Sequence, residues 1–459
     1  MKRFLGVMMC CAIVATGCAR EVSRRDAANP TPNARIDTNA GFGDLTDVCR
    51  SGTPSGSPTI GVTPTEVRIA TFADAGYAGR PGLNQEFFDT ADVFARWCND
   101  RGGINGRRIV IDHRDAAVTN VRARMEESCA SDFAMVGGGA VFDQDGVATR
   151  LECLLPDFAG LVLSNQARGA DLLVQPMPNP PTELHIGILN YLGARFPAAT
   201  KHVGILAADL ATTKTVGDQN DQAVRSLGWK VAVNDAYPAA GVTDWTPYAQ
   251  KLKDAGVRGL VWIGEPENLA FLLSALHDIR YRLDFIRVDP NNYDQNLITT
   301  AGALLADRNV FITGGFVPFE GAGPNTATGQ YLRAFARYQP TGKSRTYLGV
   351  QAWSAWLLFA KSALTCGNQL TRTCAFHAAR KVTAWTGGGL HAQTSPAANT
   401  TVNCTVVMRA TPRGFVRATD THPNVGIYHC SPKNIFALPA DPANRTTLAE
   451  LGQSITNLK

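Results

Sequence analysis

The chain has 459 residues, of which 45% are hydrophobic and 18% are charged, and its formal net charge is +5. This composition excludes a largely disordered chain, and the length exceeds what one hydrophobic core usually organises, so we expect two or three domains. No long basic run follows the first residues, which argues against nucleic acid or an anionic membrane surface as a partner.

The N-terminus has the pattern of an export signal. Lys2 and Arg3 are followed by a short apolar stretch at residues 4–14 and by small residues before Cys18. Such a stretch is too short to cross a bilayer of roughly 30 Å as a helix. The ending resembles the lipobox of bacterial lipoproteins, which implies a signal peptide at residues 1–18 and a lipid on Cys18. The alternative is an ordinary signal peptide cleaved nearby, and both interpretations predict export.

Residues 19–58 are expected to form a flexible tether and a lead-in to the folded body. Up to about residue 44 this stretch is rich in Asn, Ala, Arg, Pro and Thr and has almost no large apolar residue. A Ser- and Gly-rich loop follows at residues 51–57.

Residues 65–115 predict the first strand–helix–strand unit. A strand at 66–72, a Gly-rich loop, a helix at 84–101 and a second strand at 108–112 follow one another with a Gly-rich turn before the second strand. In an open parallel sheet, loops after the carboxyl ends of strands line the ligand crevice. The loop that carries Asp74, Gly76 and Tyr77 is therefore the first candidate for a functional role.

The alternation of helices and strands continues to the C-terminal part of the chain. In the first series, the remaining elements are a helix at 119–130 with Thr119 as N-cap, a strand at 133–136, a helix near 144–154 and a strand at 161–164. A Pro-rich segment at 176–181 is the first expected crossing between domains. The second series has helices at 182–195, 214–227, 246–255, 266–279 and 294–301, and strands at 202–207, 229–234, 258–263, 284–288 and 309–313.

The last part of the chain begins with a Gly- and Pro-rich crossing at 314–324. Helices are expected at 326–338, 346–365 and about 373–384, followed by a polar crossing at 387–400 and a β-hairpin within 401–430 that turns at 411–414. Trp353 and Trp356 in the second of these helices are expected in the core.

These elements predict an α/β protein with two Rossmann-like lobes, each an open parallel sheet flanked by helices. About three hinge crossings would join the lobes and leave a ligand cleft between them. The expected N-terminal lobe comprises residues 59–180 and 318–386, the C-terminal lobe comprises residues 181–317 and 387–440, and residues 441–459 form a tail.

Eight cysteines lie beyond the leader, an even number that argues for disulfides in an exported protein. Eight cysteines allow about 105 pairings, so the expected pairs follow from the positions of the cysteines relative to the expected helices and strands. Cys366 and Cys374 lie at one helical corner, Cys404 and Cys430 lie on two late strands, Cys129 and Cys153 flank one strand, and Cys49 would tie the lead-in to Cys98. Zinc is the weaker alternative because no Cys or His pairs have ligand spacing.

Several segments resemble the type I periplasmic binding proteins, and in particular the leucine/isoleucine/valine-type solute receptors of ABC importers. They are GVTPTEVRI at 61–69, NDRGGINGR at 99–107, TDWT at 243–246 and AGVR at 255–258. The resemblance covers roughly residues 60–365 and implies a bilobal receptor that closes on a ligand. We expect no cofactor and no metal site.

The resemblance implies ten ligand-binding positions in the loops at the cleft. They are Tyr77, Ala140, Val141, Phe142, Asn165 and Arg168 in the first lobe, and Glu265, Asn291, Asn292 and Tyr293 in the second. Positions 140–142 have no serine, where amino-acid receptors usually have a serine-rich stretch. With Arg168 for a carboxylate and Glu265 for an amine or hydroxyl groups, the implied ligand is small and polar.

Four of these residues also have a simpler interpretation. Arg168 could be a surface arginine, Glu265 could favour a helix start, and Asn291 and Asn292 could be turn residues. Enzymatic motifs are missing from the sequence, since the histidines are scattered and no nucleophile elbow or metal-binding helix motif occurs.

The expected function is that of a monomeric receptor, lipid-anchored to the outer face of a bacterial cell membrane, that delivers a small polar ligand to the membrane permease of an ABC importer. The ligand classes considered are amino acids, amides and related carboxylates. The alternative from another class is a sensor or scaffold lipoprotein with the same bilobal body, and a hydrolase is a distant third.

Overall fold

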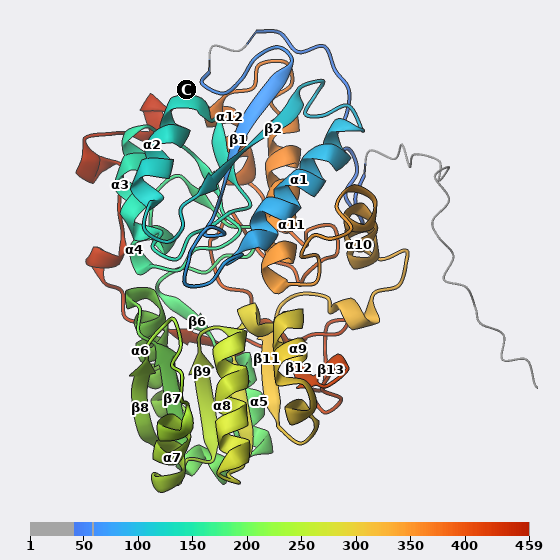
Figure 1. Ribbon diagram of the computed structural model, residues 1–459. Coiled ribbons are helices and arrows are strands. Elements are labelled where there is room, and N and C mark those ends of the chain that lie inside the picture. The colour runs from blue at the N-terminus through green and yellow to red at the C-terminus, as the bar shows by residue number, and fades with distance from the viewer. Residues whose placement is uncertain (1–40, 57–58, 459) are drawn as a thin grey trace, which may run out of the picture. The chain divides into compact units, whose positions relative to one another are not determined.

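The computed structural model describes residues 41–56 and 59–458. The expected signal peptide, Cys18 and most of the tether lie outside the described residues. Figure 1 shows an α/β fold with a five-stranded and an eight-stranded sheet, both flanked by helices. We call the five-stranded sheet with its helices the first lobe, and the eight-stranded sheet with its helices the second lobe.

The first sheet is wholly parallel, with the strand order β2-β1-β3-β4-β5. Its strands are β1 (Glu66–Ala73), β2 (Arg108–Asp115), β3 (Ala134–Val136), β4 (Asp157–Phe158) and β5 (Leu173–Val174). Its helices are α1 (Gln85–Asn99), α2 (Val121–Ser131), α3 (Gln144–Glu152) and α4 (Asn165–Arg168), joined by α10 (Ala327–Tyr338), α11 (Tyr347–Leu364) and α12 (Arg372–Ala379) from much later in the chain.

Strand β1 is buried on both of its faces, as parallel strands covered by helices are. Val67 and Ile69 point to the core that contains α1 and α11, whereas Ala70 and Phe72 pack with residues of α2. Trp353 and Trp356 of α11 are fully buried, which confirms them as core residues.

The second sheet has five parallel strands with an antiparallel extension at one edge. Its strands are β7 (Val203–Ala208), β8 (Val231–Tyr237), β9 (Gly259–Ile263), β10 (Phe285–Val288), β11 (Val310–Gly314), β12 (Cys404–Thr411), β13 (Gly414–Arg417) and β14 (His429–Cys430). Its helices are α5 (Gly187–Arg195), α6 (Ala211–Ser226), α7 (Thr246–Asp254), α8 (Pro266–Asp278) and α9 (Gln295–Ala301).

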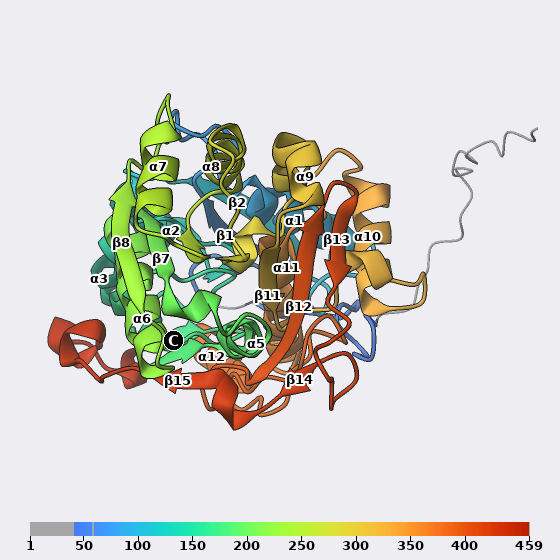
Figure 2. The same cartoon turned by 90° about the horizontal axis from the view of Figure 1, so that it is seen from below.

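The expected C-terminal hairpin forms and joins this sheet. Strand β12 pairs antiparallel with β11 and with β13, and the chain turns between Thr411 and Gly414 (Figure 2). The second sheet therefore consists of five parallel strands with an antiparallel edge, and the expected α/β class with parallel sheets flanked by helices is confirmed. Hairpin periodicity shows that two strands pair with each other but does not show which sheet edge they extend.

Two expected elements of the first part differ in the structure. The strand expected at 161–164 is instead β4, four residues earlier, because Met135 pairs with Asp157 and the chain then leaves the sheet at Gly160. The helix expected from residue 182 is preceded by β6 (Glu183–His185), which pairs with β15 (Ile435–Ala437) of the C-terminal tail. Neither pairing partner is local in sequence, so periodicity alone could not place these strands.

Four disulfides connect the described cysteines, and they join the four pairs that the sequence predicts. They are Cys49–Cys98, Cys129–Cys153, Cys366–Cys374 and Cys404–Cys430. Short 3₁₀ helices complete the fold at Ala199–Lys201, Pro290–Asn292, Gly302–Ala306, Phe319–Gly321, Pro432–Asn434, Pro442–Asn444, Ala449–Leu451 and Ile455–Asn457. In the part of the chain that the structure describes, no helix combines the length and apolar character needed to cross a bilayer.

Candidate functional site

Loops from the carboxyl ends of both sheets meet at the interface between the lobes. Arg80, in the loop after β1, forms an ion pair with Glu265, with Nη1 2.7 Å from Oε2, and donates from Nη2 to Glu267 Oε1 at 3.1 Å. Both glutamates follow β9 in the second lobe. The ion pairs therefore join the two loop regions that a parallel α/β fold offers for ligand binding.

Asp74 holds together the loops of the first lobe. Its buried carboxylate accepts hydrogen bonds from the amide of Val118 at 2.7 Å (Oδ1) and from the amide of Val141 at 2.8 Å (Oδ2). Burial raises the pKa of Asp74, whereas these two hydrogen bonds lower it. The loops after β1, β2 and β3 are thereby fixed relative to one another through one side chain.

The expected ligand residues of the first lobe lie around this connection. Tyr77 is half-buried, and its ring lies close to Gly79, where a Cβ atom would come within 2.7 Å of the ring. Ala140 is buried, while Val141 and Phe142 are half-buried in the loop after β3. The four residues are thus placed on two adjacent loops.

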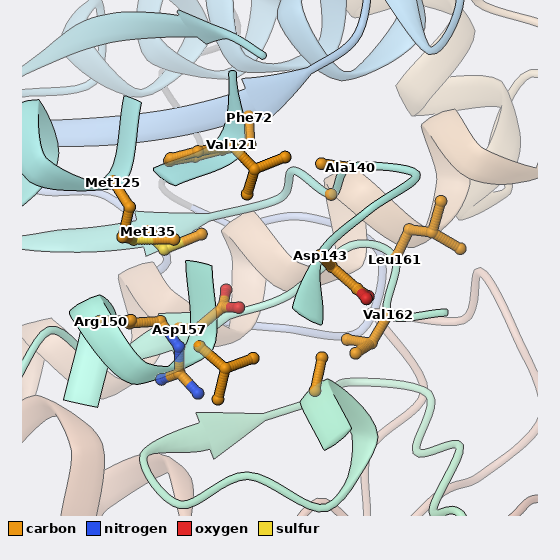
Figure 3. Close-up of a pocket in the computed structure, with 13 residues that line it drawn as sticks. Phe72, Val121, Met125, Met135, Ala140, Asp143, Arg150, Asp157, Leu161 and Val162 are labelled. Atoms are coloured by element: carbon orange, nitrogen blue, oxygen red, sulfur yellow. The ribbon is translucent and has the colours of Figure 1, made fainter. Parts of the chain in front are cut away.

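Beneath the loop after β3 lies a small cavity of about 30 Å³ (Figure 3). Its wall is mostly apolar, with Asp143 and Asp157 as acidic exceptions and Arg150 beside Asp157. Burial raises the pKa of Asp157 to about 7 and that of Asp143 to about 6. Ligand pockets are usually about 300 Å³ or larger, so this cavity is too small for an amino acid.

Asn165 and Arg168 lie at the first crossing between the lobes. Arg168 is only 2% exposed, so its interpretation as a surface arginine is wrong. Its guanidinium donates to the carbonyls of Asn179 and Pro180 at 2.8 and 2.7 Å, and Nη1 lies 3.3 Å from Oε1 of Gln219 in α6. Asn165 Oδ1 accepts hydrogen bonds from both Arg168 and Gln219. These contacts bind α4 to the crossing segment and to the second lobe.

A groove of about 980 Å³ also borders Arg168. It is formed by residues near β5, by Phe376 and Arg380, and by the C-terminal tail from Ala440 to Ile455. None of the loops after β1, β3, β9 or β10 lines it. The groove is therefore separate from the region where Arg80 meets the second lobe.

In the second lobe, the loops after β9 and β10 are bonded to each other. Asn291 and Asn292 both donate from Nδ2 to the carbonyl of Gly264, at 3.2 and 3.1 Å. Glu265 is the N-cap residue of α8, yet its side chain makes no capping hydrogen bond and pairs with Arg80 instead. The carboxylate of Glu265 therefore interacts with a charge at the interface between the lobes and does not cap α8.

Tyr293 packs inside an aromatic cluster. It is 1% exposed, its ring lies 4.8 Å from that of Phe316 and 4.3 Å from that of Phe415, and its hydroxyl donates to Glu320. The structure thus buries the ring of Tyr293 among residues that link the crossing after β11 to the hairpin.

Several charged residues at the interface were not singled out from the sequence. Besides Arg80 they are Glu86, Glu267, Asp294 and Lys343. Lys343, in the segment between α10 and α11, donates from Nζ to the carbonyl of Gly82 at 2.9 Å. Nothing in local periodicity distinguishes such loop and helix-start charges from ordinary surface residues, and Lys343 does not even follow a strand.

The family comparison agrees with the fold. The sequence profile described as "Periplasmic binding protein" matches residues 78–414. No curated protein sequence matches the chain.

Solved structures of ABC transporter proteins have the same fold. A fatty acid ABC transporter substrate-binding protein from Thermomonospora curvata is 15% identical with a TM-score of 0.67, and the match covers 84% of this chain and 99% of that one. A branched-chain amino acid transporter substrate-binding protein from Streptococcus pneumoniae in complex with isoleucine is 13% identical (TM-score 0.59; 77% and 100% covered). A branched-chain amino acid ABC transporter protein from Thermus thermophilus with bound valine is 12% identical (TM-score 0.64; 81% and 98% covered).

At these identities the solved structures show similarity of fold alone, and that fold is the bilobal one expected from the sequence. The profile match shows the family as well as the fold, because it spans most of the described chain and includes strands of both sheets. The resemblance to the type I periplasmic binding proteins is therefore confirmed, and the chain belongs to the periplasmic binding protein family.

Proposed function

We propose that the chain is the solute-binding receptor of an ABC-type importer and captures a small polar ligand between its lobes by hinge closure. Proteins of this family bind small ligands and interact with ABC permeases. The observation that carries the proposal is the pairing of Arg80 with Glu265 and Glu267, which brings polar side chains of both lobes together at the strand ends. A ligand that contacts both sets stabilises the closed arrangement.

The ligand classes proposed are amino acids, amides and related carboxylates. The ten positions predicted in the sequence remain proposed contacts; among them Glu265 itself pairs with Arg80, and Tyr77 lies in the same loop as Arg80. Lipid attachment at Cys18, a monomeric state and the division into two lobes at the predicted residue ranges are further parts of the proposal.

A thermal-shift and calorimetry screen of the mature protein tests this function. The ligands are isoleucine, valine, arginine, glutamine, octanoate and glucose, each over a wide range of concentrations. A ligand at about 100 times its dissociation constant should raise the free energy of unfolding by roughly 2.7 kcal/mol. If none of the compounds raises the melting temperature or releases heat on titration, the sensor or scaffold alternative is favoured.

The position of the site is tested with Tyr77→Ala. Because Tyr77 is half-buried in a loop, its truncation should leave the ligand-free melting temperature nearly unchanged and should weaken binding of any ligand found in the screen. Tyr248→Ala, a half-buried tyrosine on α7, is the matched control. Equal affinities for the two variants would place the ligand elsewhere.

A further inference from the structure

The loops of the second lobe present a group of carboxylates to Arg80. Glu265 and Glu267 bind its guanidinium, and Asp294 at the start of α9 is close enough to influence the pKa of Arg80 as well. Nδ2 of Asn296 donates to the same Glu267 oxygen at 3.0 Å. The guanidinium thus lies among second-lobe groups although its own backbone belongs to the first lobe.

Carboxyl groups outnumber cations at this interface. Arg80 and Lys343 are the cations, and they face four carboxyl groups, those of Glu86, Glu265, Glu267 and Asp294, each of which interacts electrostatically with one or both of the cations. Burial raises the pKa values of Glu86, Glu265 and Asp294, and a further positive group at this interface would favour the ionised form of these carboxyl groups.

The side chain of Glu86 gives an independent indication that this interface lacks a hydrogen-bond donor. It is 5% exposed, and no hydrogen bond reaches its Oε2 from any described residue. The nearest cation, Nζ of Lys343, is 3.8 Å from that oxygen. Oε2 of Glu267 is likewise buried without a partner among the described residues. Buried carboxylate oxygens without donors are costly, and a ligand with several N–H groups would satisfy them.

We propose that this interlobe carboxylate cluster recognises a guanidinium-bearing small molecule, and that Arg80 occupies its place in the ligand-free molecule. The geometry already accommodates a guanidinium, because the group of Arg80 contacts Glu265 at 2.7 Å and Glu267 at 3.1 Å. A planar guanidinium is weakly hydrated and forms paired hydrogen bonds with carboxylates. No three acidic, His or Cys side chains among the described residues converge to hold a metal ion, so an organic cation fits better.

This inference rests on the proposed function and narrows its ligand class. A guanidinium ligand would take over the second-lobe carboxylates, and its remaining N–H groups would reach Glu86 from the side of the first lobe. Arg80 would move away, so it acts as an internal competitor. Removing Arg80 should then strengthen ligand binding, which is the opposite of what is expected for a residue that contacts the ligand.

Calorimetry with arginine and citrulline on the full mature chain tests the ligand class. The two molecules have almost the same shape, but citrulline carries a neutral urea group in place of the guanidinium. Arginine should bind at least about tenfold more tightly than citrulline, because a urea leaves the carboxylates without a cation. Agmatine, which keeps the guanidinium and lacks the carboxylate, should also bind, whereas putrescine should bind more weakly because it offers only amines.

Two variants test the role of the protein groups. Arg80→Gln should bind arginine about three- to fivefold more tightly, as expected from the loss of two partly exposed ion pairs that compete with the ligand. Arg108→Gln, an exposed arginine at the start of β2, is the matched control and should bind like the wild type. Glu86→Gln keeps the side-chain shape and should weaken arginine binding roughly fivefold or more.

The outcomes separate this inference from the proposed function. Tight binding of citrulline, isoleucine or octanoate with no preference for arginine would overturn the guanidinium site and leave the receptor function intact. Weaker arginine binding by Arg80→Gln would show Arg80 to be a ligand contact and would overturn its role as a competitor. If no compound of either screen binds, both the inference and the proposed function fail.

Discussion

Single buried carboxyl groups set the pH response of this protein. Burial raises the pKa of Glu86 and Asp157 to about 7 and of Asp132 and Asp143 to about 6. An acid whose pKa is raised on folding binds its proton more tightly in the native state. It therefore contributes stability below its unfolded pKa, and this contribution is lost as the pH rises through the folded value.

For Asp157 the window lies between its unfolded value of 3.8 and about 7. We expect the free energy of unfolding to fall between pH 4 and pH 8, and Asp157→Asn to remove roughly 4 kcal/mol of that fall because the amide does not ionise. Urea unfolding at several pH values measures it, with the exposed Asp145→Asn as control. Parallel pH curves for Asp157→Asn and the wild type would contradict the prediction.

Asp74 is a second residue whose substitution has a defined consequence. Asp74→Asn replaces one accepting oxygen by an NH₂ group and leaves the amide of Val118 or of Val141 without an acceptor. The loss should cost roughly 1–3 kcal/mol at neutral pH, and it should also weaken ligand binding by loosening three loops. Chemical denaturation measures it against Asp218→Asn, an exposed residue on α6. An unchanged denaturation midpoint would show that the two hydrogen bonds are dispensable.

At the scale of elements, the disulfides connect helices to segments that lie elsewhere in the chain, and the length of chain between the two cysteines differs from one disulfide to another. Cys49–Cys98 closes a separation of 49 residues and ties the lead-in to α1, whereas Cys366–Cys374 closes only 8 residues at the corner between α11 and α12. In the chain-entropy description, a longer loop restricts the unfolded chain more, so the first disulfide contributes more stability.

Serine substitution of each pair tests this difference. Loss of Cys49–Cys98 should lower the free energy of unfolding by about 4 kcal/mol and loss of Cys366–Cys374 by about 2.5 kcal/mol. Differential scanning calorimetry of the two double variants measures both, and the second serves as the control for the first. A larger effect at Cys366–Cys374 would mean that packing around the corner outweighs chain entropy.

Most helices could be located from the sequence to within a few residues, because each has its own apolar stripe. For α10 the expected range was 326–338 and the helix is Ala327–Tyr338; for α11 it was 346–365 and the helix is Tyr347–Leu364. Short strands were harder. Strand β4 has two residues and β6 has three, which is too few for a periodic signal, and each is defined only by its partner strand.

At the scale of the whole molecule, the ion pairs of Arg80 are expected to bias the lobes toward closure without a ligand. Their side chains are 23–33% exposed, so each pair should contribute about 0.2–1 kcal/mol. Arg80→Ala should therefore increase the open population of the ligand-free protein severalfold. Double electron–electron resonance between spin labels on α1 and α8 measures this, with Arg108→Ala as control. A distance distribution equal to that of the wild type would show that closure depends on other contacts.

The candidate site was less predictable than the fold. Loop position after strand ends pointed to Tyr77 and Glu265, and Glu265 does meet the other lobe. Arg80, Glu86 and Lys343 were missed because their partners lie far away in the chain. Arg168 and Tyr293 were proposed for the cleft, and the structure shows them buried in the first crossing and in an aromatic cluster.

The sequence by itself determined the α/β class, the order of most elements, the four cysteine pairs and the family, because each depends on local periodicity, on spacing or on short motifs. The tertiary structure alone decided that the hairpin β12–β13 extends the second sheet, that β6 pairs with the C-terminal tail, and that Arg80 meets Glu265 and Glu267. The physical reason is common to all three. Contacts between distant segments depend on how the folded units pack against one another, and the local pattern of residues does not determine that packing.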